Sequence, residues 1–252
     1  MLVTGASSGI GAALAIGFAR HGAVVGICAR RTERLSEVLA RVREHSPASR
    51  MWTVDLAVPE QVDAFAQAAV AELDGVDVLV NNAGVPKRRA VTALTPEVVE
   101  QVMAINYLSP VRLTLALLPG IVERGGRIVN VSSVAARLSP PAEAAYAASK
   151  AALTAWSESM AIDLRDTEVL VHVVNPGVVD TELFEQPDND RLEIDIEPLA
   201  ADALVDPVLE QLDAGTFEIY VPGWFTDVVA AKFPDVGTYL EGVKAFARGE
   251  WA

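Results

Sequence analysis

The sequence has little cysteine and few positive charges. Its single cysteine, Cys28, lies in the apolar run AVVGIC and has no second cysteine for an internal disulfide, which is typical of a reducing compartment. Its 20 lysines and arginines face 34 aspartates and glutamates, which gives a net charge of -14. Nucleic acids and anionic membrane surfaces require a positive field on the protein, so this balance argues against both as partners.

The sequence also lacks a long uninterrupted apolar run. The most apolar segment, residues 102–122, is broken by Asn106, Pro110, Arg112 and Pro119, which favours a buried interface helix over a membrane-spanning one. The chain begins directly with a predicted strand and shows no secretory signal. We therefore expect a cytoplasmic protein without a membrane partner.

Short apolar runs recur along the chain and are separated by helix-length segments. At 252 residues and 51% hydrophobic, the chain is long enough for one large domain with a continuous core. The alternation predicts right-handed βαβ units, hence an α/β fold with a doubly wound parallel sheet of Rossmann type and helices on both faces. We expect a single domain over residues 1–252. The predicted strands are residues 2–3, 23–28, 51–54, 76–80, 127–131, 169–174 and 217–221.

A tyrosine and a lysine, Tyr146 and Lys150, lie four residues apart in a segment rich in helix formers, residues 142–159. That spacing places both on one helical face. An ammonium about 4 Å from the phenol, at an effective dielectric near ~20, would favour the phenolate by roughly 4 kcal/mol, or about three pKa units. The pair could then exchange protons near neutral pH. The alternative is an interface aromatic beside a solvated charge.

Ser133 lies thirteen residues before Tyr146, just after a predicted buried strand at residues 126–131. The carboxyl ends of strands are where an α/β sheet places its chemistry. The hydroxyl, the phenol and the ammonium of Lys150 are therefore expected to meet around one carbonyl group.

Three glycines, Gly5, Gly9 and Gly11, lie between the first predicted strand and a predicted helix at residues 9–21. Their missing side chains would let a pyrophosphate approach the helix N-terminus, which predicts a dinucleotide site. The alternative is an ordinary tight turn. The motif NNAG at residues 81–84, after the fourth predicted strand, favours the dinucleotide.

The end of the second predicted strand indicates which dinucleotide binds. Versions of this fold that bind NAD usually carry an acid there, whereas this chain has Ala29, followed by Arg30 and Arg31. Two cations before a helix expected to start near Thr32 are unfavourable with its dipole unless an anion joins them, and the 2′-phosphate of NADP is such an anion. We predict NADP(H) in preference to NAD(H); the alternative is that both arginines are merely solvated.

Together these residues resemble the short-chain dehydrogenase/reductase family, whose active site combines a Ser, a Tyr-x-x-x-Lys and an upstream Asn. The resemblance covers TGASSGIG at residues 4–11, NNAG at 81–84 and NPGVVDT at 175–181, and so about the first 180 residues. The catalytic residues that it implies are Asn106, Ser133, Tyr146 and Lys150.

The resemblance also implies a role for each residue. Tyr146 would exchange the proton, Ser133 would hydrogen-bond the carbonyl oxygen, and Lys150 would hold the cofactor ribose and lower the pKa of the tyrosine. Asn106 would bend its helix and hold a water that links the lysine to solvent; the alternative is a satisfied core amide. No metal is implied. The implied cofactor contacts are Gly5, Ser7, Ser8, Gly9, Ile10, Arg30, Arg31, Asp55, Leu56, Asn82, Ala83, Gly84, Tyr146, Lys150, Pro176, Gly177, Val179 and Thr181.

Three further segments bear on substrate and assembly. Residues 95–120 predict a helix that packs on the sheet and on a partner subunit, in a homodimer or homotetramer. Residues 182–200 are expected to form a substrate loop whose acidity disfavours phosphate-rich substrates, although Lys87, Arg88 and Arg89 leave an anionic substrate group open. Residues 224–252 predict a variable tail of one or two amphipathic helices.

The sequence therefore predicts an NADP-dependent oxidoreductase that acts on a small-molecule ketone, aldehyde or alcohol. One alternative is an NAD-dependent alcohol dehydrogenase of the same family. The other is an NADP-binding scaffold without catalysis, which would tolerate loss of an active-site residue, whereas all four positions are filled here.

Overall fold

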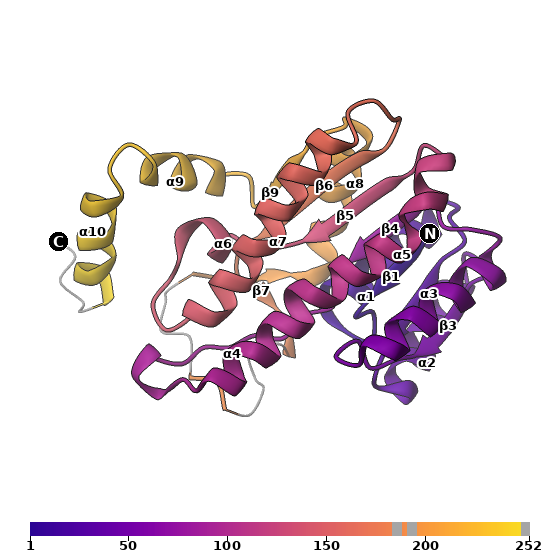
Figure 1. Ribbon diagram of the computed structural model, residues 1–252, viewed down its shortest axis with the longest axis horizontal. Helices are drawn as coiled ribbons and strands as arrows, with labels where there is room; N and C mark the ends of the chain where they lie inside the picture. Colours follow the sequence, from indigo (N-terminus) through magenta and orange to yellow (C-terminus); the bar gives the residue numbers. More distant parts are fainter. Residues whose placement is uncertain (183–187, 191–195, 248–252) are drawn as a thin grey trace.

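The computed structural model describes residues 1–182, 188–190 and 196–247. Within them, a sheet of seven strands has the order β3-β2-β1-β4-β5-β6-β9, and every neighbouring pair is parallel (Figure 1). The strands are β1 (Leu2–Thr4), β2 (Gly26–Ala29), β3 (Arg50–Thr53), β4 (Val78–Asn81), β5 (Arg127–Val131), β6 (Leu170–Pro176) and β9 (Glu218–Val221). The α/β fold class and its doubly wound parallel sheet are confirmed.

Alternate residues of the central strands enter two separate cores. Leu2, Cys28 and Ile128 join the core on one face of the sheet, while their neighbours Val3 and Val129 join the core on the other face. A strand's side chains point alternately to its two faces, and both faces are covered here, so these strands are apolar throughout instead of alternating with polar residues.

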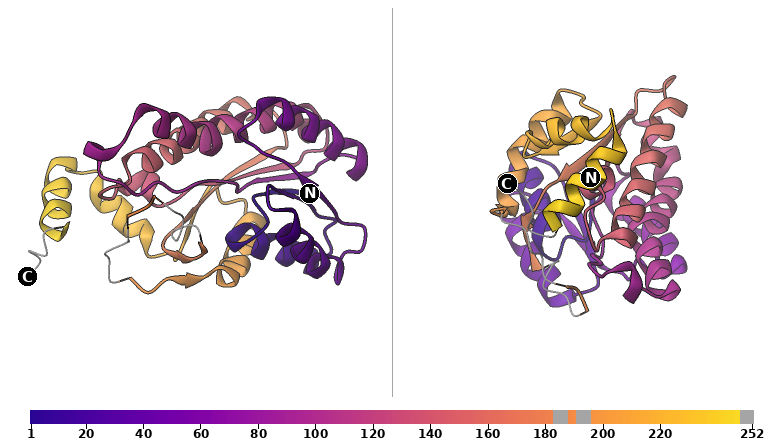
Figure 2. Two further views of the ribbon diagram at one scale, coloured as in Figure 1. Left: turned by 90° about the horizontal axis from the view of Figure 1, so that it is seen from below. Right: turned by 90° about the vertical axis from the view of Figure 1, so that its left-hand side faces the viewer.

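Helices cover both faces of the sheet, as Figure 2 shows edge-on. One core contains residues of α1, α2 and α8, and the other contains residues of α3, α5 and α7. The helices are α1 (Gly9–Arg20), α2 (Thr32–Arg43), α3 (Pro59–Leu73), α4 (Pro96–Met103), α5 (Ser109–Glu123), α6 (Ala135–Leu138), α7 (Ala144–Asp163), α8 (Val205–Asp213), α9 (Phe225–Lys232) and α10 (Val236–Ala247).

The helix predicted at residues 95–120 has three parts. A π-helical segment, Ala104–Leu108, separates α4 from α5 and contains Asn106. In the described part of the chain, Pro96–Glu123 is the helix long and apolar enough to cross a membrane by length and composition, and 44% of its most apolar window is buried inside the fold. Buried core helices meet the same criterion, and Leu113 and Leu117 of α5 pack in the core.

The C-terminal tail forms two helices, α9 and α10, which extend away from the sheet (Figure 1). They are tied back to the chain near α6: Lys232 of α9 donates a hydrogen bond to the carbonyl oxygen of Arg137, and the Tyr239 hydroxyl of α10 donates one to the carbonyl oxygen of Leu138 at 3.0 Å. The tail therefore packs beside the short helix that follows Ser133.

The strand order reverses between β1 and β4. Successive strands are added outward from β1 on one side and outward from β4 on the other. In a doubly wound sheet, the crevice outside the carboxyl ends at such a reversal is where ligands bind. The glycine loop after β1 and the NNAG motif after β4 lie at this point.

Candidate active site

A cavity of about 400 Å³ lies at the carboxyl ends of the strands. It is lined by every residue that the sequence analysis assigned to cofactor contacts, and by the catalytic candidates Ser133, Tyr146 and Lys150. Asn106 is fully buried behind the cavity wall. The lining also includes residues that sequence reasoning missed: Val54, Ala57, Val85, Ile105, Val131 and Glu182. Most of these are apolar, and their residue type carries no signal of a site.

The glycine loop is shaped by the NNAG segment packed on it. Gly5 has a φ of +67°, and a Cβ there would lie 2.6 Å from the Cα of Ala83. A Cβ on Gly11 would lie 2.4 Å from Nδ2 of Asn82, which donates a hydrogen bond to the carbonyl oxygen of Thr4 at 2.9 Å. Side chains are therefore excluded where the loop begins α1, and the backbone N–H groups at the helix start are left facing the cavity. This arrangement fits a pyrophosphate.

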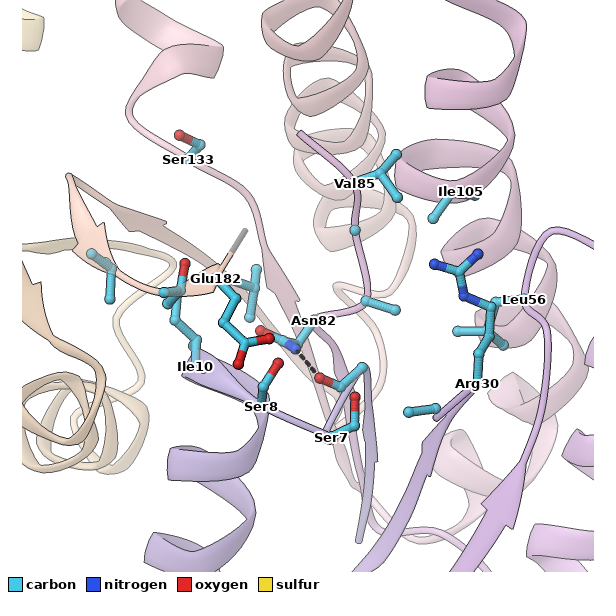
Figure 3. A pocket seen from close by; sticks show the side chains of 18 of the residues that line it. Ser7, Ser8, Ile10, Arg30, Leu56, Asn82, Val85, Ile105, Ser133 and Glu182 are labelled. Atoms are coloured by element: carbon cyan, nitrogen blue, oxygen red, sulfur yellow. Dashed lines mark hydrogen bonds between the residues drawn. The ribbon is translucent and has the colours of Figure 1, made fainter. Parts of the chain in front are cut away.

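Two arginines follow β2, and they differ in their hydrogen-bond partners among the described residues. Arg31 donates hydrogen bonds to Oγ of Ser7 at 3.1 Å, to Oγ of Ser8 at 2.6 Å and to Oε2 of Glu182 at 3.0 Å. Arg30 lines the cavity and has neither a hydrogen bond nor an ion pair with any described residue. Figure 3 shows its guanidinium pointing away from Glu182, on the other side of Ser7.

Arg31 is not the only partner of Glu182, because Arg34 of α2 also forms an ion pair with this carboxylate. The two guanidiniums lower the pKa of Glu182, Arg34 more strongly than Arg31. The carboxylate therefore stays charged and is shared by the two arginines, while Arg30 stays unpaired among the described residues. Most of the predicted substrate loop at residues 182–200 lies outside the described residues.

The three candidate catalytic side chains that line the cavity are Ser133, Tyr146 and Lys150. Tyr146 and Lys150 lie on the first turns of α7 and are 8% and 4% exposed. The Ser133 hydroxyl, just after β5, accepts a hydrogen bond from the Ala135 N–H at 3.1 Å and lowers the pKa of the Tyr146 phenol. Lys150 donates from Nζ to the carbonyl oxygen of Val131 at 2.8 Å, and its Nζ lies 6.0 Å from the centre of the Tyr146 ring.

Asn106 connects the π-helical segment to this wall. Its Oδ1 accepts a hydrogen bond from the Val85 N–H at 2.8 Å, and its Nδ2 donates to the Val85 carbonyl oxygen and to Oγ of Ser149, both at 3.0 Å. A Cβ on Gly84 would lie 3.2 Å from Oδ1 of Asn106 and 3.4 Å from Nζ of Lys150. The amide is therefore satisfied and also lies beside the lysine, so the two interpretations from the sequence are compatible.

The protonation of the tyrosine differs from the sequence expectation. Burial raises the pKa of Tyr146 to about 12; the Ser133 hydroxyl opposes this shift, the Glu143 carboxylate adds to it and the Arg88 guanidinium opposes it. Burial also lowers the pKa of Lys150 to about 8. The pKa of the phenol is thus not near 7. The Lys150 ammonium is directed at the Val131 carbonyl oxygen, and the cost of removing the phenolate from water outweighs the attraction between phenolate and ammonium.

Comparisons with known proteins agree with this geometry. The family profile described as "short chain dehydrogenase" matches residues 1–192. Dehydrogenase/reductase SDR family member 7B from Rattus norvegicus is 39% identical over 191 residues, which cover 73% of this chain and 58% of that protein. The chain thus matches little more than half the length of such curated relatives.

Two solved structures superimpose over the whole chain. A short-chain dehydrogenase from Streptomyces avermitilis gives a TM-score of 0.83 at 30% identity, covering 100% of this chain and 97% of that one. A short-chain dehydrogenase from Sphingobium yanoikuyae, in complex with NADPH, gives 0.81 at 29% identity, covering 100% and 95%.

Proposed function

Because the chain belongs to the short-chain dehydrogenase family, we propose that it is an NADP-dependent oxidoreductase that interconverts a small-molecule carbonyl compound and its alcohol. One observation carries this proposal. Ser133, Tyr146 and Lys150 line the same cavity as the glycine loop, and the Ser133 hydroxyl lowers the pKa of the Tyr146 phenol. Two hydroxyls are therefore available to one oxygen atom beside a dinucleotide site.

In carbonyl reduction, the bound nicotinamide supplies the hydride. Ser133 donates a hydrogen bond to the carbonyl oxygen, on which negative charge develops. Tyr146 donates its proton to the same oxygen, and burial keeps this phenol protonated at neutral pH, the form that reduction requires. The Lys150 ammonium then stabilises the phenolate that remains. Asn106 fixes the adjoining Val85 segment through the oxygen and the nitrogen of its side-chain amide.

The choice of NADP is supported by the contrast between the arginines. A charged 2′-phosphate needs a cation that is not already neutralised, and Arg30 meets this requirement among the described residues. Ala29 offers no carboxylate to the ribose hydroxyls of NAD. An NAD-dependent enzyme remains the rival, in which Arg30 is a solvated charge.

We propose an uncharged substrate. Val85 and Ile105 contribute apolar surface to the cavity. Of the three cations that left an anionic substrate group open, Arg88 is paired with Glu143, Arg89 forms an ion pair with Asp188 at 3.9 Å, and Lys87 donates to the carbonyl oxygen of Asp188 at 3.1 Å. None of the three lines the cavity, so a ketone, an aldehyde or an alcohol of low polarity fits best.

The remaining proposals concern the whole molecule. We propose a cytoplasmic homo-oligomer in one domain, with residues 182–200 as the substrate loop and 224–252 as the variable tail. The exposed Leu108 and Leu115 of the π-helical segment and α5, and Ile162 of α7, support a homodimer or homotetramer with these helices at the subunit contact.

The test is an assay with both nucleotides against a panel of uncharged ketones, aldehydes and alcohols. We expect turnover with NADPH or NADP⁺, at a higher kcat/KM than with the non-phosphorylated form, and loss of turnover in Tyr146→Phe. Equal use of NADH would overturn the cofactor proposal. Nucleotide binding without turnover of any compound would favour the scaffold.

A further inference from the structure

A buried ion pair lies next to the proposed active site and has no role in the mechanism given above. Nε and Nη2 of Arg88 both donate to Oε1 of Glu143, at 2.9 and 2.8 Å. The two side chains are only 6% and 10% exposed. Removing two charges from water is costly, and an apolar pair of similar volume is often at least as stable. Core stability alone therefore does not account for this pair.

Glu143 is coupled to the helix that carries the tyrosine. It occupies the N-cap position of α7, three residues before Tyr146, and its carbonyl oxygen accepts the hydrogen bond of the Ala147 N–H at 2.7 Å. Any displacement of Glu143 thus moves the first turn of α7. Tyr146 is on that turn.

Arg88 belongs to a segment that is hydrogen-bonded to two other parts of the chain. Its backbone N–H donates to Oδ1 of Asn189 at 2.8 Å, and its carbonyl oxygen accepts from the Asp190 N–H at 2.8 Å. The next residue, Arg89, donates its N–H to the carbonyl oxygen of Ala142 at 2.6 Å. The segment after the NNAG motif is thus joined both to residues 188–190 and to the start of α7.

We propose that Arg88 and Glu143 are positioning residues for Tyr146: together they hold its helical turn in place, and their opposite charges balance each other's field at the phenol. This inference rests on the proposed function, because it concerns the proton that Tyr146 exchanges. It assigns a role to two residues outside the candidate catalytic set Asn106, Ser133, Tyr146 and Lys150.

The electrostatics of the site give the two charges opposite effects. The groups that face the phenol are Ser133 at the end of β5, Lys150 on α7, and the Arg88–Glu143 pair. The Glu143 carboxylate raises the pKa of Tyr146 and the Arg88 guanidinium lowers it. Removal of the carboxylate alone should therefore lower this pKa, whereas removal of the guanidinium alone should raise it. Removal of both should leave it nearly unchanged.

A loss of packing has a different signature. Disorder of the first turn of α7 would lower kcat in any of these variants, but it would not move the pH dependence in opposite directions. The sign of the shift therefore separates an electrostatic positioning role from a merely structural one.

The experiment measures kcat/KM for alcohol oxidation against pH, because the basic form of Tyr146 is then the active one. We expect Glu143→Gln to move the profile to lower pH, and Arg88→Met to move it to higher pH. The double variant, which leaves no unpaired buried charge, should return close to the wild-type profile. Asp63→Asn, which breaks the exposed Asp63–Arg112 ion pair between α3 and α5, is the matched control and should cause no shift.

A second readout does not depend on turnover. The ultraviolet difference titration of wild type against Tyr146→Phe isolates the phenol of Tyr146, and it should show the same signed shifts in the two single variants. Shifts of equal sign in both, or none in either, would overturn the inference while leaving the proposed function intact. Full turnover by Tyr146→Phe would instead remove the proposed function, and this inference with it.

Discussion

The ammonium of Lys150 is 2.8 Å from the carbonyl oxygen of Val131 and 6.0 Å from the centre of the Tyr146 ring. Both side chains are buried, and burial shifts their pKa values in opposite directions: that of Lys150 falls to about 8, and that of Tyr146 rises to about 12. In both cases burial disfavours the charged form. The pKa of Lys150 therefore bears on how stability depends on pH, and the pKa of Tyr146 bears on which form of the phenol takes part in catalysis.

The lysine should make stability depend on pH in alkaline solution. Its pKa is 10.5 when unfolded and about 8 when folded, so between these values the unfolded chain binds more protons and stability rises with pH. At about 1.4 kcal/mol per unit, the 2.5-unit difference amounts to about 3 kcal/mol. The free energy of unfolding of wild type relative to Lys150→Met, from urea titrations between pH 7 and 10.5, should increase by up to this amount. A constant difference would mean that the lysine is not desolvated.

Replacement of the tyrosine should separate chemistry from binding. Tyr146→Phe keeps the ring but loses the transferable proton, so kcat should fall by about 10²- to 10⁴-fold. The dissociation constant of NADPH, from cofactor fluorescence, should change little. Tyr107→Phe in the π-helical segment is the matched control and should keep wild-type kcat. A Tyr146→Phe variant with near-normal kcat would refute the mechanism.

Replacement of the unpaired arginine should change cofactor preference. A charge-assisted hydrogen bond of about 1.5 to 3 kcal/mol corresponds to roughly ten- to hundredfold in affinity. Arg30→Ala should raise KM for NADPH by that factor and leave KM for NADH almost unchanged. The exposed Arg41 on the helix that follows, α2, supplies the control, and Arg41→Ala should alter neither value. Equal losses with both nucleotides would show that Arg30 does not read the 2′-phosphate.

Glu182 should compete with the cofactor for the neighbouring arginines. Its carboxylate pairs with Arg31 and Arg34 at the edge of the cavity, where a phosphate would be attracted to the same cations. Exposed ion pairs are weak, so Glu182→Gln should tighten NADPH binding by no more than about fivefold. The gain should shrink as salt is raised from ~0.05 to ~0.5 M, because exposed charges are screened. Weaker binding in this variant would contradict the competition.

Much of the fold could be predicted because its signals are local. Each strand is a short apolar run, and the glycine loop and the NNAG motif mark the reversal point directly. The π-helical turn around Asn106 was not predictable in this way, because one extra residue in a turn barely alters the apolar spacing over residues 95–120. Its presence follows from tertiary contacts of Asn106 with Val85 and Ser149.

The site was predictable in composition but not in its electrostatics. Tyr146, Lys150 and Ser133 are recognisable by type and spacing, and they do lie around one cavity. The direction of the Lys150 ammonium depends on a backbone carbonyl, and the pairing of Arg88 with Glu143 joins residues far apart in the chain. Neither contact has a sequence signature. The raised pKa of Tyr146 follows from burial that only the folded chain produces.

The parallel sheet puts the cavity and the candidate catalytic side chains that line it at one edge, and this geometry suits the protein to attachment on a solid support. The turn after α8, at the opposite edge, carries the exposed Ala214. The natural thiol, Cys28, is fully buried, and burial raises its pKa to about 12, so it should not react with maleimide reagents. Ala214→Cys would then give one reactive thiol. If the protein were attached to an electrode through that thiol, the opening of the cavity would face the solution.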